Sequence, residues 1–559
     1  MAKIPNDWTR VTRTMRSDKE QRRMGLLARL AESVACRSRY EAAAGLLAGF
    51  IFAGALLARA GNSPARQTTT GARAGGPVYV VLWFDTEDYV LPQSDDAAKR
   101  IAELLTAQGV HATFKVVGEK ARTLERRHRE DVIAALDKHA IAYHSNYHSW
   151  RVSPAEFEEA LDWQEGVAEF IRREQPGIDD IQRIFGRIPT AYGQPGSSWC
   201  PEAQPAIRKM GIHVYLDDGE QIGLDGKPFW YGGVLNIFHM KYIDDLRPNN
   251  DWTNVEEVKA NFKKAYTALS QSGGGLISIY FHPCEFIHKE FWDAVNFSHG
   301  AEPSRSEWKL PPMKTPEEQA RSFAFLEKFV EYMKTLPVQF VTAPETLKLY
   351  PDAAQTRPFS RQDLTEIARN LRPAVSFQVY DDYDLSASEI LWLLNTYVSR
   401  AIEKEPSQFI ELQGTPLGPS SDSTNMATSE EAKVPWYQFQ WAVQEVDGAL
   451  RQNAQVPTVV WVGGNPYSPA SYLVALAHVA GSLLEGNQPP QQVTLAPAQL
   501  DAAKYVAKDT PQLWSWPIFR PGFNGQHLLD LARLQAWTLK PALLRAAHGR
   551  TASGALPRY

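Results

Sequence analysis

The chain has 559 residues, of which 44% are hydrophobic and 22% are charged, and its formal net charge is −5. This length exceeds what one hydrophobic core supports, so we expect two or more domains. The composition is that of a globular protein, and it carries no basic footprint for a nucleic-acid partner. With three cysteines there is neither a disulfide framework nor a structural zinc cluster, although Cys200 and Cys284 could form one bridge.

The N-terminal segment predicts export. Residues 1–41 are rich in Arg and Lys and are expected to stay in the cytoplasm. Residues 42–58 carry no charge and fall slightly short of the ~20 residues that span a bilayer, so 42–60 should be a signal-anchor or a signal peptide. Residues 61–76 then form a linker. We expect a periplasmic or cell-surface protein, either anchored in the membrane through residues 42–58 or secreted.

Short apolar runs alternate with helical patterns from residue 77 onward. We expect strands at 77–85, 110–118, 140–144, 211–219, 275–283 and 338–344, and helices near 94–109, 129–138, 153–173 and 315–336. Such alternation predicts an α/β protein with a parallel sheet or barrel, whose functional side chains gather at the carboxyl ends of the strands. The titratable residues at those ends are Asp85, His144, Asp217 and His282.

The character of the chain changes near residue 356. Strand patterns become fewer, and residues 418–433 form a polar stretch typical of a loop. The segment 387–393 is similar to 470–476, and each opens an amphipathic helix. We expect a mainly helical accessory region at 356–559, built from a duplicated unit. It is either a cell-wall-binding module or a structural appendage that docks a partner.

The stretch HSNYH places His144 and His148 four residues apart just after a strand. Imidazoles suit zinc and similar divalent metals, but this spacing also arises by chance. A carboxylate must complete a metal site, and the run FDTED supplies Asp85, Glu87 and Asp88 at the end of the first strand. Three close carboxylates repel one another, and a bound cation would relieve that repulsion.

In their order and spacing, these motifs resemble those of the polysaccharide deacetylases, which are metal-dependent carbohydrate esterases. WFDTED (83–88) is similar to the family's TFDDG motif, and HSNYH (144–148) matches its H-[ST]-x-x-H motif. GVHATFKVVG (109–118) is similar to the family's GVxATFFVxG, and YFHP (280–283) to its last motif. The resemblance implies a distorted (β/α)7 barrel at 77–355 and one divalent metal, commonly zinc.

The resemblance also implies a role for each of these residues. His144 and His148 would be metal ligands, joined by Glu87 or Asp88, and the spacing of the acidic run leaves that choice open. Asp85 would be the general base toward a metal-bound water that attacks an acetamide carbonyl.

His282 is the implied general acid, and a nearby carboxylate should keep its imidazole protonated. The candidates for that carboxylate are Asp217, Asp218 and the rival Glu285. A backbone N–H near Gly196 would stabilise the oxyanion. Trp199 follows the same motif, where it is either a sugar platform or a packing residue.

One position departs from the family pattern. Gly193 stands where the third motif has an arginine that positions the base, so Asp85 should lack a charged partner unless Arg183 or Arg187 substitutes. An insertion at 284–312 follows the acid. It should either line the cleft or pack as a surface loop.

We therefore expect a metal-dependent hydrolase that removes N-acetyl groups from a cell-wall or extracellular polysaccharide. Two alternatives stay open: an amidase that acts on a non-sugar amide, and a weak or inactive barrel that binds glycan. The missing arginine favours the inactive barrel, whereas the complete set of histidines and carboxylate argues against it.

Overall fold

The computed structural model describes residues 75–405, 407–423 and 426–545. The expected basic segment, the export signal and most of the linker lie outside the described residues. Among the described residues, no helix combines the length and apolarity needed to cross a membrane. The described residues from 75 onward belong to one compact unit, and the expected boundary between 355 and 356 stays a prediction.

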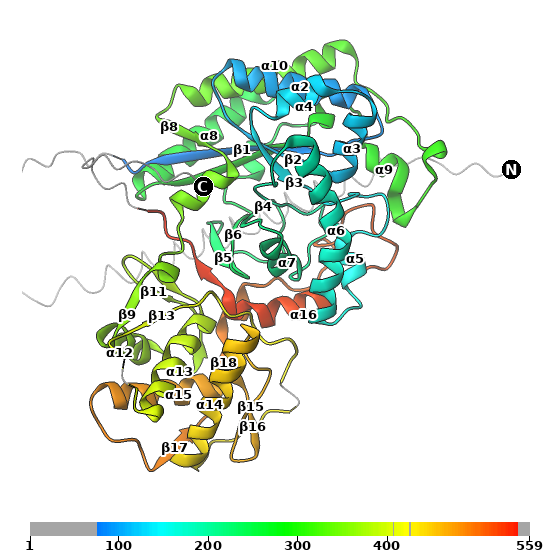
Figure 1. The fold of residues 1–559 in the computed structure, drawn as a ribbon. Helices are drawn as coiled ribbons and strands as arrows, with labels where there is room; N and C mark the ends of the chain where they lie inside the picture. Colours follow the sequence, from blue (N-terminus) through cyan, green and yellow to red (C-terminus); the bar gives the residue numbers. More distant parts are fainter. Residues whose placement is uncertain (1–74, 406, 424–425, 546–559) are drawn as a thin grey trace, which may run out of the picture. The chain divides into compact units, whose positions relative to one another are not determined.

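A parallel sheet carries the candidate site (Figure 1). Its strands are β1 (Val78–Thr86), β2 (Thr113–Val116), β3 (Ala140–Tyr143), β4 (Val214–Asp217), β6 (Val234–Phe238), β7 (Gly275–Phe281) and β8 (Val338–Val341). β1 pairs in parallel with β2, β7 and β8, and β2 pairs with β3. Tyr192 bridges β3 to β4, which pairs with β6. The expected parallel sheet is confirmed, but within the described residues no ladder joins β6 to β7, so hydrogen bonding does not close the barrel there.

Side chains that alternate along the strands separate two apolar layers. Phe84 packs between the sheet and the outer helices, whereas its neighbour Trp83 faces the inner side with Leu216 and Ile237. Burial of each large apolar side chain contributes about 1.5–3 kcal/mol to folding. Asp85 continues the inner row one step past Phe84, and this places its carboxylate at the carboxyl edge of the inner face.

Helices cover the outer side of the sheet. They are α2 (Gln93–Ala107), α3 (Gly118–Arg126), α4 (Glu130–Leu136), α5 (Pro154–Glu158), α6 (Trp163–Phe185), α7 (Ala203–Lys209), α8 (Val255–Gln271) and α10 (Pro316–Lys334). The capping box at Ser153 is present, but one helix does not run on to Arg173 as expected. Asp162 takes an extended conformation, with φ −71° and ψ 156°, and starts the separate helix α6.

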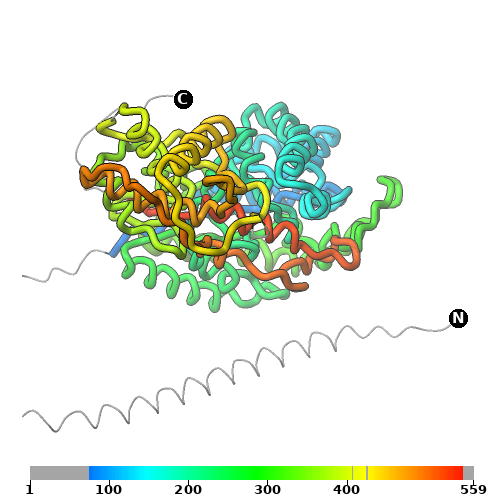
Figure 2. Tube along the Cα trace, turned by 90° about the horizontal axis from the view of Figure 1, so that it is seen from below, coloured from blue at the N-terminus to red at the C-terminus, as the bar shows by residue number. Residues whose placement is uncertain are grey.

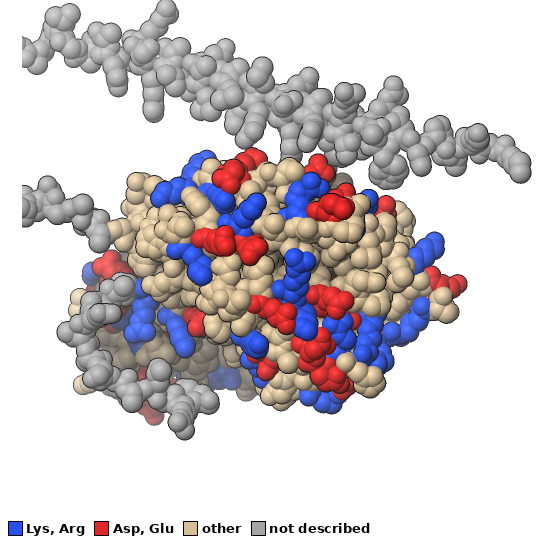
Figure 3. Space-filling model, turned by 90° about the horizontal axis from the view of Figure 1, so that it is seen from above, with Lys and Arg blue, Asp and Glu red and all other residues tan. Residues whose placement is uncertain are grey.

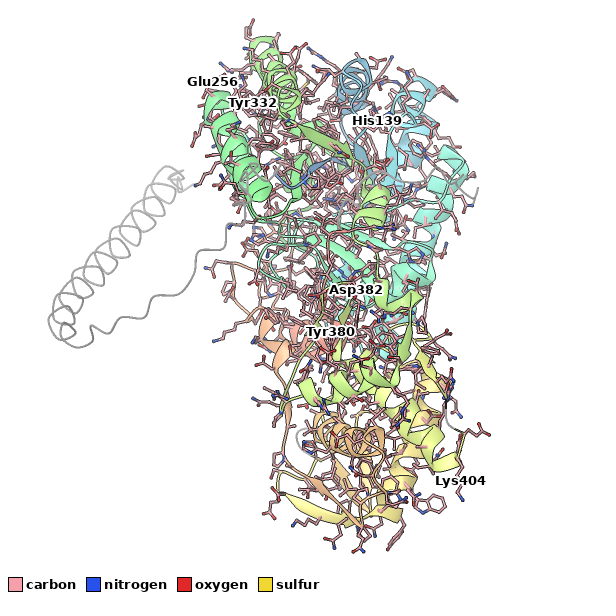
Figure 4. All side chains as sticks on the ribbon, turned by 90° about the vertical axis from the view of Figure 1, so that its left-hand side faces the viewer. His139, Glu256, Tyr332, Tyr380, Asp382 and Lys404 are labelled. Atoms are coloured by element: carbon pink, nitrogen blue, oxygen red, sulfur yellow. The ribbon has the colours of Figure 1, made fainter. Side chains whose placement is uncertain are left out.

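Residues after 355 build a second core. The helices around it are α12 (Arg361–Asn370), α13 (Ala387–Glu403), α14 (Trp436–Asn453) and α15 (Pro469–Leu484). The two similar segments do open helices, since Ser386 caps α13 and Ser468 caps α15 through backbone N–H groups. In Figure 4, Lys404 lies at the side of this region, and Tyr380 and Asp382 lie where it meets the first part of the chain.

The last part of the chain returns to the first core. α16 (Gln526–Gln535) packs there through Leu528 and Leu529, and β19 (Lys540–Pro541) pairs antiparallel with β5 (Phe229–Tyr231). In Figure 1 the red α16 lies next to α7 and β5, and Figure 2 shows the same red segment crossing the middle of the molecule. The Lys540 ammonium, in turn, binds Asp352 at 2.7 Å and Glu389 at 2.9 Å. The C-terminal residues therefore join both cores.

Charged side chains of both signs are intermixed over the face that Figure 3 shows. The described part of that face carries no extended surface of one charge. Cys200 and Cys284 are both buried free thiols, so the bridge between them does not form.

Candidate metal and catalytic site

Three buried side chains converge where β1 and β3 end. The ligand atoms of Glu87, His144 and His148 all lie within 4.8 Å of one another. Glu87 Oε2 is 2.9 Å from His148 Nε2 and 3.4 Å from His144 Nε2. The three residues are 3%, 1% and 4% exposed, respectively. One carboxylate and two imidazoles in this arrangement form a donor set typical of zinc.

The two histidines present their Nε2 atoms to the cluster. His144 Nδ1 lies 2.9 Å from the carbonyl oxygen of Gly193, which accepts its proton and leaves the Nε2 lone pair facing Glu87. His148 Nε2 is buried, and although it lies 2.9 Å from Glu87 Oε2, it makes no hydrogen bond of normal geometry within the described residues. Such an unsatisfied atom is costly unless another partner is present. A divalent cation held by these residues would satisfy it, so the site fits the expected metal.

The protonation states of Glu87 and His144 suit a cation. Burial alone would raise the pKa of Glu87, but the positive charges of His148 and His282 hold it well below its usual value. Burial lowers the pKa of His144, so this imidazole is neutral at neutral pH. Metal ligands must be deprotonated, and ionised Glu87 and neutral His144 meet that requirement. Burial alone would lower the pKa of His148, but Glu87 raises it, so a cation that binds there would displace the proton of His148.

Asp88 makes a different set of contacts. Its Oδ1 accepts hydrogen bonds from the backbone N–H groups of Val90 at 2.8 Å and Leu91 at 3.1 Å. Its Oδ2 lies 3.1 Å from His288 Nε2. The carboxylate thus anchors the turn after β1. Of the two carboxylates that the sequence left open, the structure groups Glu87, and not Asp88, with the histidines.

Two matched substitutions test this choice. Glu87→Gln is expected to lose the metal, because an ionised ligand becomes a neutral amide. Asp88→Asn is expected to keep the metal but lower Tm, because hydrogen bonds to a charged group are worth about 1.5–3 kcal/mol each. Metal content by mass spectrometry and thermal unfolding measure both effects. Equal metal loss in the two variants would contradict the assignment.

The expected base and acid lie next to the cluster. Asp85 Oδ2 is 3.6 Å from His282 Nε2 and 3.9 Å from His144 Nε2. Burial alone would lower the pKa of His282, but the neighbouring carboxylates, Glu87 first among them, raise it to about 9. The imidazole is therefore protonated at neutral pH, as a general acid requires.

Glu285 contacts His282 through both of its carboxylate oxygens. Its Oε1 accepts the backbone N–H of His282 at 2.9 Å, and its Oε2 lies 3.9 Å from the imidazole Nδ1. Arg247 Nη2 contacts the same Oε2 at 2.7 Å. Burial alone would raise the pKa of Glu285, but the charge of Arg247 and contacts with His282 lower it to about 2. Glu285 is therefore ionised beside the acid.

Asp217 and Asp218, expected beside the acid, have other partners. Asp217 Oδ2 lies 2.6 Å from Lys115 Nζ, and Asp218 Oδ1 lies 3.3 Å from His239 Nδ1. Asp217 ends β4 and Asp218 follows it, and β4 pairs with β6 and not with the strand that carries the acid. The expectation is corrected to Glu285, which the short turn after β7 brings back to the acid.

Lys115, which the motifs do not predict, lies among these groups. Its Nζ is 2.9 Å from Asp85 Oδ1, and its side chain is fully buried. Burial alone would lower the pKa of Lys115, but Asp217 and Asp85 raise it, so the ammonium stays charged. Asp85 therefore has a charged partner, contrary to expectation. Neither surface arginine supplies it, because Arg183 pairs with Glu125 and Arg187 with Asp137.

A signal for Lys115 was present in the sequence. In GVHATFKVVG the lysine occupies the position where the family pattern has phenylalanine, within a strand that is otherwise apolar. A charged residue at the centre of a buried strand requires a partner of opposite charge.

The two residues expected at the oxyanion and substrate positions differ in their surroundings. Gly196 has φ +50° and lines the cleft, and a Cβ there would lie 2.4 Å from the ring of Trp516. Trp199 is 0% exposed and packs in the first core. The interpretation of Trp199 as a sugar platform is corrected, because a stacking platform needs an exposed ring face.

Two segments that are distant in sequence close the metal site. In the insertion 284–312, Trp292 Nε1 donates to Glu87 Oε1 at 3.0 Å, so the insertion lines the site. From the C-terminal region, the Trp516 ring stands edge-on to His148, with centroids 5.4 Å apart. No motif pointed to Trp516, since it lies more than 300 residues from the ligands.

A cleft of about 470 Å³ opens beside the base and the acid. Its lining includes Trp83, Asp85, Gly196, Tyr280, His282 and Gln512. This volume lies within the range of small-ligand sites, about 300–1,000 Å³. The arrangement can activate water, supply a proton to a leaving group and hold a ligand about as large as a sugar.

No family model and no curated protein matches this chain. Among solved structures, it is similar to a protein of Mycobacterium smegmatis described as a polysaccharide deacetylase. The two share 16% identity, the match covers 49% of this chain and 90% of that chain, and the TM-score is 0.32. A probable polysaccharide deacetylase from Pseudomonas aeruginosa PAO1 shares 15% identity over 50% of this chain and 93% of that chain, with a TM-score of 0.33.

A CE4 family pseudoenzyme from Bacillus anthracis shares 13% identity over 48% of this chain and 66% of that chain, with a TM-score of 0.27. The solved structures similar to this chain thus include both named deacetylases and a pseudoenzyme.

Proposed function

We propose that this chain is a metal-dependent hydrolase that removes acetyl groups from an N-acetylated sugar of a cell-wall or extracellular polysaccharide. The observation that carries the proposal is the convergence of the Glu87–His144–His148 cluster with Asp85 and His282. The motif resemblance adds the reaction class. Zinc is the metal that best fits the donor set. When bound, it would act as a Lewis acid toward water and the amide carbonyl.

The chain's own residues would move the protons. Asp85 presents Oδ2 toward His144 and His282, and it would take a proton from the attacking water. The water oxygen bonds to the acyl carbon, and the carbon–nitrogen bond breaks. His282 would give its Nε2 proton to the departing nitrogen, so the products are acetate and a free amine. Backbone N–H groups near Gly196 are available for the oxyanion.

The pH dependence of the reaction should follow His282. Its pKa is raised to about 9, and the acid form is needed, so kcat/KM should fall as pH rises through the pKa of His282. Glu285→Gln removes a neighbouring negative charge and should shift this alkaline limb to lower pH. A pH–rate profile of both proteins measures the shift. An alkaline limb that stays in place would contradict the pairing of His282 with Glu285.

The second candidate is an amidase that acts on a non-sugar amide. The enclosure of the site by Trp292 and Trp516 favours it, because a closed site admits a short substrate. Acetate release from N-acetylglucosamine oligomers and from small N-acetylated amines, measured side by side, separates the two. Release from the oligomers supports the deacetylase. Release from the small amines alone would favour the amidase, and no release from either would favour a glycan-binding protein.

The same proposal includes two further points: the chain is exported, and residues 356–559 bind glycan. Tyr437, Trp441 and Trp461 are 59%, 71% and 51% exposed, and exposed aromatic rings are suited to stacking on sugars. An exported, membrane-anchored or secreted chain would meet its substrate outside the cytoplasm. Binding of the full chain and of a Trp441→Ala variant to isolated cell wall tests the accessory role.

A further inference from the structure

We infer that Lys115 is a positioning residue for the general base. Its ammonium holds one oxygen of Asp85, and the other oxygen then faces the acid and the metal ligands. This inference rests on the proposed function, since it concerns how that same site orients its base.

The register of the sheet makes the two residues neighbours. Asp85 of β1 is paired with Lys115 of β2, so their side chains leave the same inner face at adjacent strands. Lys115 Nζ contacts Asp85 Oδ1 at 2.9 Å. Asp85 Oδ2 lies 3.6 Å from His282 Nε2 and 3.9 Å from His144 Nε2. The two oxygens of the carboxylate therefore have separate tasks.

Lys115 is itself fixed from several sides. Its Nζ donates hydrogen bonds to Asp217 Oδ2 at 2.6 Å and to the carbonyl oxygen of Leu216 at 3.1 Å. The ammonium also lies 4.1 Å from the centre of the Trp83 ring. A buried lysine with these contacts has little freedom to move, so its ammonium stays beside Asp85 Oδ1, with which it forms an ion pair without hydrogen-bond geometry.

Gly193 shows that the lysine fills a position that a side chain would otherwise take. A Cβ at Gly193 would lie 2.2 Å from Lys115 Nζ and 2.5 Å from Asp217 Oδ2. Any residue larger than glycine would displace the ammonium. A side chain at position 193 and the Lys115 ammonium would therefore occupy the same space. Lys115, on β2, supplies the positive charge beside Asp85. The absence of an arginine at position 193 therefore does not argue for an inactive protein.

A purely structural role makes a different prediction. If Lys115 served only to neutralise the buried Asp217, removing both charges together would leave catalysis intact. Lys115→Met alone is a poor test, because it leaves two buried carboxylates without a cation and should destabilise the fold. The double variant Lys115→Met/Asp217→Asn lowers this cost, because only Asp85 is then left without the cation, and it keeps the apolar stem of residue 115.

The experiment compares kcat, KM, zinc content and Tm for the wild type, Asp217→Asn and the double variant. In the double variant, kcat should fall at least about 30-fold, while zinc content and KM stay at the wild-type values. This loss is part of the rate enhancement of about 10²–10⁴ that a positioned base supplies. Asp217→Asn keeps the Lys115–Asp85 pair and should lose less than the double variant. Lys99→Met, which removes a surface pair with Asp131, is the matched control and should leave kcat unchanged.

A double variant whose kcat lies within about threefold of Asp217→Asn would overturn the inference and leave the proposed function standing. A wild-type chain that binds zinc but releases no acetate would overturn the proposed function, and the inference with it.

Discussion

His144→Ala is expected to yield protein without bound metal and to lower kcat/KM at least about 100-fold, because loss of outer-shell partners alone costs 10–100-fold in metal sites. His144 is a central donor, since its Nδ1 is bound to the Gly193 carbonyl and its Nε2 faces Glu87. Alanine leaves one imidazole and one carboxylate, which is too few ligands for tight zinc binding. Metal analysis and acetate release measure the two effects independently.

The matched control for this variant is His478→Ala, which removes an exposed histidine of α15 in the accessory region. It should keep both metal and activity. If His144→Ala retained the metal at the wild-type level, the assignment of the ligands would be wrong, whatever its activity.

Asp85→Asn is expected to lower kcat by about 10²–10⁴, the usual contribution of a general base, while the metal and the fold remain. The amide keeps the shape of the carboxylate but cannot take the proton from water. Asp85 is not part of the Glu87–His144–His148 group, so zinc content should match the wild type. Steady-state kinetics with zinc analysis on the same samples separates this effect from ligand loss.

Two results would count against the role of Asp85. A kcat within about threefold of the wild type would show that another group accepts the proton. Loss of zinc together with activity would show that Asp85 is a ligand. His144→Ala and Asp85→Asn thus form a pair that divides metal binding from proton transfer.

The central strands were predictable because their signal is local. Runs such as VYVVLWFD are apolar on both sides, as a strand buried between helices requires, and β1 is found within one residue of the expected bounds. The break between α5 and α6 was not predictable from the apolar pattern. It depends on the extended backbone of Asp162, which acts as the cap of α6.

The site was predictable to the extent that it lies in contiguous motifs. His144, His148, Glu87, Asp85 and His282 each sit at a strand end, and parallel pairing brings those ends together. The choice between Glu87 and Asp88 required the direction of each side chain, which spacing does not give.

The residues that the motifs missed act across strands or between segments that are distant in the sequence. Lys115 reaches Asp85 through the register of β1 with β2, and Trp516 arrives from the C-terminal region that packs back on the first core. Neither contact produces a recognisable pattern among residues that are close together in the sequence. For Lys115, the one available sign was a charge in an apolar strand.

Zinc titration of metal-free protein, with acetate release from N-acetylglucosamine oligomers as the readout, tests the central claim most directly. The protein is stripped with a chelator and assayed at rising ratios of zinc to chain. Activity should appear with zinc and reach its plateau at one equivalent, and Glu87→Gln should show no such rise. Acetate release that is undiminished in fully metal-free protein, or no release at stoichiometric zinc, would contradict the account.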